Sequence, residues 1–139
     1  RRSSLRRYTG FDDMILALRT DSPTAELYLY DVGEVARRIW RADRQLARDL
    51  LGEIDALFGD KSWRDITGIV VFKGPGSFTG LRIGCTVMNT AAYARAIPIV
   101  GTSGDQWIAD GLKRLKTGEN DRMILPDYGA EPRVTRPTR

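Results

Sequence analysis

The first third of the chain alternates apolar and polar positions in short runs that are typical of β-strands. Residues 14–19 form an apolar run, residues 25–31 alternate leucine with tyrosine, and residues 34–41 carry a valine, an isoleucine and a tryptophan. Turn-forming residues separate these runs at 20–23 and at 32–33. Because short turns join neighbouring antiparallel strands, the pattern predicts an antiparallel meander of three strands.

The following segments change between helical spacing and short apolar runs. Leucine and isoleucine recur at helical intervals after Asp43, which is expected to cap a helix, and Gly59 ends that run. Pro98 is expected to interrupt the last strand early. The spacing predicts, in chain order, a helix at 43–58, a strand at 67–73, a helix at 80–95, a strand at 97–101 and a helix at 104–116. The end of the chain is expected to add at most one strand.

The order β-β-β-α-β-α-β-α predicts a single α/β lobe with a mixed five-stranded sheet, in which parallel strands and flanking helices follow the antiparallel meander. This order resembles that of a ribonuclease-H-like domain, the building block of the actin-like ATPases. A chain of 139 residues suits one domain. We expect an N-terminal extension at 1–13, the lobe at 14–117 and a C-terminal tail at 118–139.

The net charge of +4 is concentrated at the two ends of the chain. Residues 1–7 carry four arginines, residues 133–139 carry three, and neither end has an acidic residue. The remaining 125 residues therefore have a net charge of −3. A contact between the basic ends and RNA is one interpretation, and solvated tails are the other.

Cys85 is the single cysteine, and the chain contains no histidine. An intrachain disulfide is therefore impossible in this sequence, which fits a reducing compartment. Zinc sites and Ser-His or Cys-His nucleophilic sites are excluded for the same reason. No apolar run approaches the roughly 20 residues that a membrane span needs. We expect a soluble, cytoplasmic domain without a membrane partner.

A glycine-rich stretch joins the predicted strand at 67–73 to the helix that follows it. It consists of Gly74, Pro75, Gly76, Ser77, Phe78, Thr79, Gly80, Leu81, Arg82, Ile83 and Gly84. A P-loop requires Gly-x-x-x-x-Gly-Lys-Ser/Thr, and no lysine stands at the required position. The dinucleotide-binding pattern Gly-x-Gly-x-x-Gly fails as well, because Thr79 occupies the place of its third glycine.

Three interpretations of this stretch stay open. The N–H groups at the start of the helix could hold a small anion. Alternatively, Ser77 or Thr79 caps the helix, and the glycines serve packing within the chain. In the third interpretation the helix contacts another chain, because its apolar arc is wider than one sheet contact needs. That arc comprises Leu81, Gly84, Cys85, Val87, Met88, Ala91 and Ala92. With the neighbouring helix at 43–58, the predicted partner interface is Gly80, Gly84, Val87, Met88, Ala91 and Tyr93.

The eleven residues from Gly74 to Gly84 resemble the signature of the TsaB (YeaZ) family. Residues 14–17 are similar to the start of that family, and residues 97–101 are similar to the strand that follows the signature. The closing stretch of the family is similar to the end of this chain at Tyr128, Pro132, Val134, Thr135 and Pro137. The resemblance covers roughly residues 14–107 and the end, and it implies a shortened form that lacks most of the second lobe.

The sequence departs from the family pattern at two further places. Arg19-Thr20-Asp21 stands where the family has Asp-Thr-Ser, and Trp40-Arg41-Ala42-Asp43 stands where a histidine is common. An arginine in place of the metal- or phosphate-related aspartate of actin-like ATPases argues against ATP hydrolysis by this chain.

The resemblance implies a non-catalytic subunit of the bacterial complex that adds the threonylcarbamoyl group to adenosine 37 of tRNA. It implies no catalytic residue, no metal and no cofactor in this chain, and leaves open a nucleotide at the junction with TsaD. The expected partners are a TsaD-like catalytic subunit, a TsaE-like ATPase and a second copy of the chain. Transfer RNA is expected to be reached only through the complex.

Two other classes of function stay open. A small actin-like enzyme that binds or hydrolyses a nucleotide would use the glycine-rich loop. It would need acidic residues for a metal, and those near strand ends are Asp21, Asp31 and Asp105. A small module that contacts tRNA would use the basic ends instead.

Overall fold

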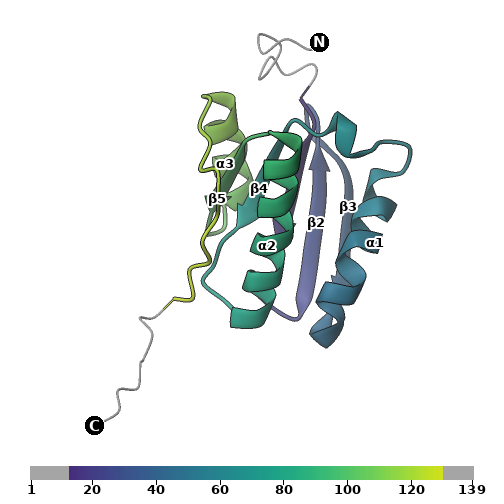
Figure 1. Ribbon diagram of the computed structural model, residues 1–139, viewed down its shortest axis with the longest axis vertical. Coiled ribbons are helices and arrows are strands. Elements are labelled where there is room, and N and C mark those ends of the chain that lie inside the picture. The colour runs from purple at the N-terminus through teal and green to yellow at the C-terminus, as the bar shows by residue number, and fades with distance from the viewer. Residues whose placement is uncertain (1–12, 130–139) are drawn as a thin grey trace.

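The computed structural model describes residues 13–129, which form a five-stranded sheet with helices on both faces (Figure 1). The strands are β1 (Ile15–Arg19), β2 (Thr24–Tyr30), β3 (Glu34–Arg41), β4 (Gly68–Phe72) and β5 (Ile99–Thr102). The helices are α1 (Leu46–Phe58), α2 (Phe78–Arg95) and α3 (Trp107–Lys116). The strand order in the sheet is β3-β2-β1-β4-β5. The predicted order of elements and the mixed five-stranded sheet are confirmed.

β1 lies at the centre of the sheet and joins its antiparallel and parallel parts. It pairs antiparallel with β2 and parallel with β4, so that Leu16 lies between Leu29 and Ile69. These three side chains are buried. Because successive side chains of a strand point to opposite faces, Leu16 and Leu18 face one core while Ala17 faces the other.

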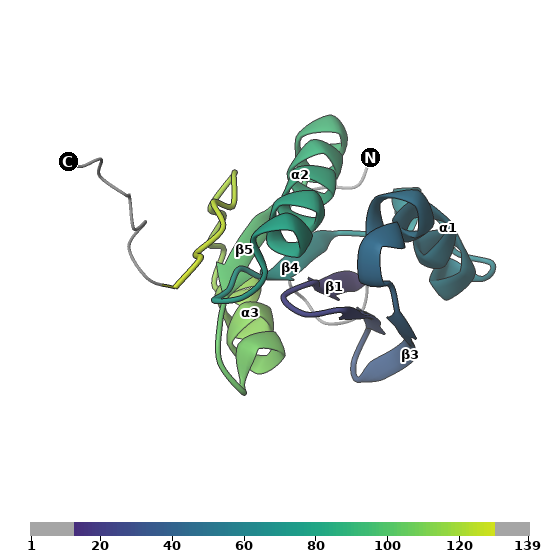
Figure 2. The same cartoon turned by 90° about the horizontal axis from the view of Figure 1, so that it is seen from below.

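Figure 2 shows α1 and α2 on one face of the sheet and α3 on the other. The core beneath α1 and α2 contains Leu50, Ile54 and Met88. The smaller core beneath α3 contains Trp107 and Leu115. Each helix therefore buries an apolar stripe at helical spacing, which is how its amphipathic sequence is accommodated.

Several element ends differ from the sequence prediction by one to three residues, and two of these differences have a clear physical reason. Asp43 does not cap α1, because a short 3-10 turn (Asp43–Gln45) precedes the helix and the Asp43 carboxylate accepts a hydrogen bond from Nε of Arg41 at 3.0 Å. β5 begins at Ile99 and not at residue 97, because Pro98 has a fixed φ and no N–H group for a ladder. The predicted cap at Asp43 was therefore wrong.

Residues 120–128, which we call the strap, run along the free edge of β5 and then beside α2 (Figure 1). They add no strand to the sheet. Ile124 is buried, and both hydrogen-bonding groups of its backbone pair with the side-chain amide of Asn89 at 2.8 and 3.0 Å. Asp121 forms an ion pair with Arg114 of α3. The strap is thus held by α2 on one side and by α3 on the other.

Two glycines within helices provide a matched test of the packing. A Cβ atom at Gly111 of α3 would overlap Val70 of β4, with Cγ2 of Val70 only 2.7 Å away, whereas a Cβ atom at Gly52 of α1 would meet nothing within 4 Å. We expect Gly111→Ala to lower the free energy of unfolding by ~1–3 kcal/mol, because the helix must move off the sheet. Gly52→Ala should raise it by ~0.5–1 kcal/mol through helix propensity. Urea denaturation measures both, and shifts of the same sign would contradict the packing described.

The ion pair of the strap makes stability depend on pH. Burial by itself would raise the pKa of Asp121, but hydrogen bonds from Arg114 and from the N–H of Gly101 outweigh burial and hold this pKa below its ordinary value of 3.8. A carboxyl group with a lowered folded pKa stabilises the fold above its unfolded pKa, and the contribution is lost as pH falls through the folded value. We therefore expect Asp121→Asn to lower stability at about pH 7 and to have little effect at about pH 2. Urea titrations at both pH values check this, with Asp60→Asn at an exposed turn as the control; an equal loss at both pH values would refute it.

Candidate functional site

α2 lies very close to the end of β1, and two glycines of the signature permit this approach. Thr20 follows β1 directly, is 2% exposed, and donates from Oγ1 to the carbonyl oxygen of Gly80 at 2.8 Å. A Cβ atom at Gly80 would overlap the carbonyl oxygen of Thr20, and a Cβ atom at Gly84 would overlap its Oγ1. Only glycine fits at both positions, so these residues serve contact within the chain.

The two earlier glycines of the signature also lie against segments of the same chain. A Cβ atom at Gly76 would lie 2.7 Å from the carbonyl oxygen of Asp21, and the N–H of Ser77 donates to that oxygen at 2.9 Å. Gly74 has a φ of +131°, and a Cβ atom there would overlap the carbonyl oxygen of Asp127 in the strap. The interpretation that the glycines serve intrachain packing accounts for all four.

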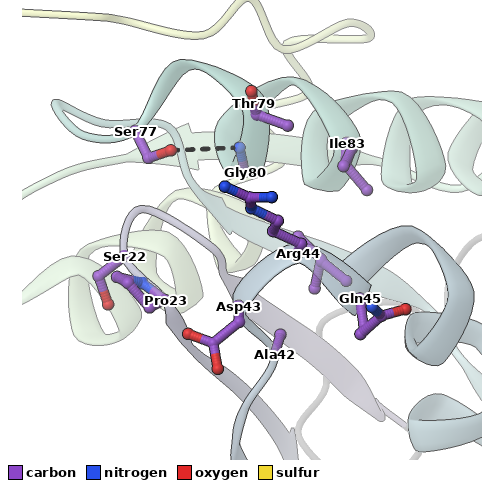
Figure 3. A pocket seen from close by; sticks show the side chains of 11 residues that line it. Ser22, Pro23, Ala42, Asp43, Arg44, Gln45, Ser77, Thr79, Gly80 and Ile83 are labelled. Carbon is purple, nitrogen blue, oxygen red and sulfur yellow. Dashed lines mark hydrogen bonds between the residues drawn. The ribbon is translucent and has the colours of Figure 1, made fainter.

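A groove of about 970 Å³ opens beside this junction, between the turn after β1, the turn before α1 and the first turn of α2 (Figure 3). Ser77 caps α2, because its Oγ accepts from the N–H of Gly80 at 3.5 Å. Figure 3 shows the guanidinium of Arg44 directed toward this turn. Ligands of α/β folds bind outside the carboxyl ends of the strands. A small anion in this groove stays a prediction.

The three aspartates considered for an enzyme site do not come together. Asp21 accepts from Nε of Arg19 at 2.7 Å. Asp31 follows β2, which is antiparallel to β1, so Asp31 and Asp21 lie at opposite ends of the strands. Asp105 is exposed before α3. Between residues 13 and 129, no group of three or more His, Cys, Asp or Glu could hold a metal ion.

Arg19, at the first departure from the family pattern, has structural partners on both sides. Arg19 lies over the ring of Phe72 at 3.9 Å while it pairs with Asp21. Its guanidinium is therefore engaged within the chain at the end of β1. Burial raises the pKa of Cys85 to about 11, so its thiol stays protonated near neutral pH.

An apolar groove of about 390 Å³ lies between the outer sides of α1 and α2. We call it the helix groove. Leu51 forms its α1 side and is 60% exposed, although its neighbour Leu50 is fully buried. Apart from Arg95 at its end, the side chains of α2 in the groove are small or β-branched, so a partner's side chains can reach the bottom. The lining residues are Leu51, Trp63, Thr86, Val87, Thr90, Ala91, Ala94 and Arg95.

Four of the six residues predicted for a partner interface reach the surface. Val87 and Ala91 line the helix groove. Gly80 lines the groove at the start of α2. Tyr93 is 88% exposed but is not among the residues that line either groove. The assignment of a partner to this surface stays a prediction.

The other two predicted residues, Gly84 and Met88, face the sheet. Met88 is fully buried in the core, and Gly84 lies against Thr20. Including them in the interface was wrong, because the centre of the apolar arc of α2 packs on the sheet and only its margin reaches solvent. A bulky residue at Gly84 would therefore test the fold and not the surface.

Sequence reasoning included the helix at 43–58 in the partner surface, but it missed Leu51 as the exposed residue of that helix and it missed the role of Asn89. Two adjacent leucines lie about 100° apart around a helix, so Leu50 and Leu51 cannot both face the sheet. That pair was a readable signal for an exposed apolar position. Asn89 holds Ile124, which is 35 residues away along the chain, and local spacing carries no signal for such a contact.

Several sequence predictions concern residues outside the described range. The basic ends at 1–7 and 133–139 lie there, as do Pro132, Val134, Thr135 and Pro137 of the closing stretch. Tyr128 is described, and its ring lies 4.7 Å from that of Phe78 in the signature. Among the described helices, none is long and apolar enough to cross a membrane.

Comparison with known proteins places these features in a family. The family model described as TsaD, tRNA N6-adenosine threonylcarbamoyltransferase, matches residues 40–117. The TsaB protein of Bacillus subtilis (strain 168), a tRNA threonylcarbamoyladenosine biosynthesis protein, is 36% identical over 116 residues, which are 84% of this chain and 44% of the relative. The TsaB protein of Escherichia coli (strain K12) is 28% identical over 102 residues, 72% of this chain and 44% of the relative.

Solved structures agree with the sequence matches. YeaZ from Pseudomonas aeruginosa superposes with a TM-score of 0.61 at 26% identity, over 66% of this chain and 44% of the YeaZ chain. The chain spans about 44% of the length of the curated relatives named above. Since the family model covers more than half of the 139 residues, the chain belongs to the TsaD family of tRNA N6-adenosine threonylcarbamoyltransferase domains, and its relatives there are TsaB proteins.

Proposed function

We propose that this chain is a non-catalytic subunit of the bacterial machinery that adds the threonylcarbamoyl group to adenosine 37 of tRNA. In this proposal the helix groove binds the TsaD-like catalytic subunit in the cytoplasm. One observation carries it: an apolar groove lies open between α1 and α2 in a chain whose relatives are TsaB proteins. A TsaE-like ATPase and a second copy of the chain are the further partners, and tRNA is reached through the complex.

The helix groove has the composition of a surface that another protein covers. Leu51 is 60% exposed on the middle of α1, and burying such a side chain fully is worth ~1.5–3 kcal/mol. Val87 and Ala91 face it from α2, so the apolar surface is continuous across both helices. Small side chains on α2 let an approaching helix come close, and helices in contact lie roughly 8–10 Å apart. The partner surface that fits is an apolar helix face.

Arg95 gives the groove a polar end. It lines the groove at the last turn of α2, and no salt bridge is found for it within residues 13–129. A carboxylate on the partner would complement this guanidinium at the rim, where charge pairs fix orientation more than they add affinity. The groove thus offers an apolar centre and one polar rim contact.

A substitution at the bottom of the helix groove tests the proposed docking. Ala91→Arg places a long charged side chain between α1 and α2, and we expect it to weaken binding to the cognate TsaD-like subunit by at least ~30-fold, the equivalent of ~2 kcal/mol. Tyr93→Arg introduces the same residue on the same helix, outside the groove, and should change affinity by less than ~3-fold. Isothermal titration calorimetry measures both, and circular dichroism confirms that both variants are folded. Equal affinities for the two variants would overturn the docking site.

Reconstituted tRNA modification tests the function itself. The cognate TsaD-like and TsaE-like subunits, a donor of the threonylcarbamoyl group and tRNA are incubated with and without this chain, and modified adenosine is quantified by mass spectrometry. We expect product only when the chain is present and little product with the Ala91→Arg variant, because docking is needed. Product formation that is indifferent to the chain would contradict the proposed function.

A further inference from the structure

The N–H and C=O groups of two residues of β5 point away from β4, toward the free edge of the sheet. The carbonyl groups of Pro98 and Thr102 accept hydrogen bonds from the N–H groups of Ile69 and Lys73 on the β4 side. In a parallel ladder, alternate residues of a strand bond to a given neighbour. The N–H and C=O groups of Ile99 and Gly101 therefore point toward the free edge of the sheet. β5 is an edge strand, and such groups are normally open to pairing with another strand.

All four outward groups are satisfied by the strap and by α3. The N–H of Ile99 donates to Oδ1 of Asn120 at 3.1 Å, and the carbonyl oxygen of Ile99 accepts from the N–H of Asp121 at 2.8 Å. The N–H of Gly101 donates to Oδ2 of Asp121 at 2.9 Å, and its carbonyl oxygen accepts from Nη1 of Arg114 at 3.1 Å. Three of these bonds use side chains, so the strap closes the edge without forming a new strand.

One buried side chain and one amide anchor the middle of the strap. Ile124 is 3% exposed and lies on Gly101, where a Cβ atom would be 3.0 Å from two of its carbons. Asn89 pairs with both backbone groups of Ile124. By contrast, the next side chain, Leu125, is 73% exposed. The middle of the strap is therefore held by a few identifiable contacts.

The two edges of the sheet are protected in different ways. β3, at the other edge, carries Arg37, Arg38 and Arg41, and charged side chains oppose pairing between edges. β5 has the sequence Ile-Val-Gly-Thr, without charge or proline. It therefore lacks the protection that β3 has in its own sequence, and the strap supplies protection in its place.

We propose that the strap is a releasable closure of β5, and that its release lets β5 pair edge to edge with β5 of a second copy of this chain. Once the strap is released, each edge presents the N–H and C=O groups of Ile99 and Gly101, and Arg114 of α3 stays on the carbonyl oxygen of Gly101. An antiparallel arrangement about a two-fold axis is self-complementary, so each copy satisfies the groups of the other. The side chains of β5 itself carry no charge and bring no repulsion to this pairing, whereas β3 carries three arginines.

The proposal uses a surface separate from the helix groove and does not rest on the proposed function. Pairing of two chains through the helix groove would also change the measured mass, so the experiment is made in the Ala91→Arg background. The release variant carries Asp121→Ala, which removes the acceptor of the Gly101 N–H and the ion pair with Arg114, and Ile124→Asp, which removes the buried anchor. The matched control carries Asp127→Ala and Leu125→Asp, the same replacements at strap positions with exposed side chains.

Hydrogen exchange by NMR reports on the edge, and light scattering reports the mass. At low protein concentration we expect the amides of Ile99 and Gly101 to exchange at least ~10-fold faster in the release variant, with Val100, which faces β4, unchanged. At high concentration the mass of the release variant should double, while the control keeps the parent mass. Asp121→Ala alone, which leaves Ile124 in the core, is measured beside it to separate edge opening from unfolding.

Two results would overturn the proposal. Parent-like protection of Ile99 and Gly101 in the release variant and in Asp121→Ala would show that the strap does not close this edge. Fast exchange at both amides with the mass of the parent, at every concentration, would show that an open β5 edge does not pair with a second copy.

Discussion

The close approach of α2 to the end of β1 determines which surface this lobe presents to other molecules. Thr20 donates to the backbone of α2, and Gly80 and Gly84 leave it the room to do so. With α2 held on the sheet, the margin of its apolar arc lies beside the exposed Leu51 of α1 and forms the helix groove. The signature therefore acts through packing: its glycines position a helix, and the helix supplies the surface.

The lobe protects both edges of its sheet and leaves the helix groove open. The carboxyl end of β1 is filled by Arg19, which pairs with Asp21 and lies over Phe72. One sheet edge carries the arginines of β3, and the strap covers the other. A subunit that acts by docking needs one available apolar surface and protection of its sheet edges. The distribution of charge and apolar surface matches that requirement.

The sequence predicted the elements well because their periodicity is strong and local. The alternation in β2 and the leucine spacing of α1 each identify one element without tertiary information. Periodicity does not show which part of an apolar arc faces the sheet, so Met88 was wrongly assigned to the interface. The strap could not be predicted, because Asn89, Arg114 and the strap meet only in three dimensions and the strap has no repeating pattern. The signature identified the family, while its geometric reason appeared only with Thr20 in place.

Mapping the surface covered by the proposed partner, a TsaD-like subunit, tests the central claim most directly. Hydrogen exchange of this chain is measured by mass spectrometry, alone and with the cognate TsaD-like subunit in excess. The account predicts slower exchange confined to α1 around Leu51 and to α2 around Ala91, with the β5 edge and the strap unchanged. Slower exchange at the groove beside Gly80 or along β5, with α1 and the outer side of α2 unaffected, would contradict it.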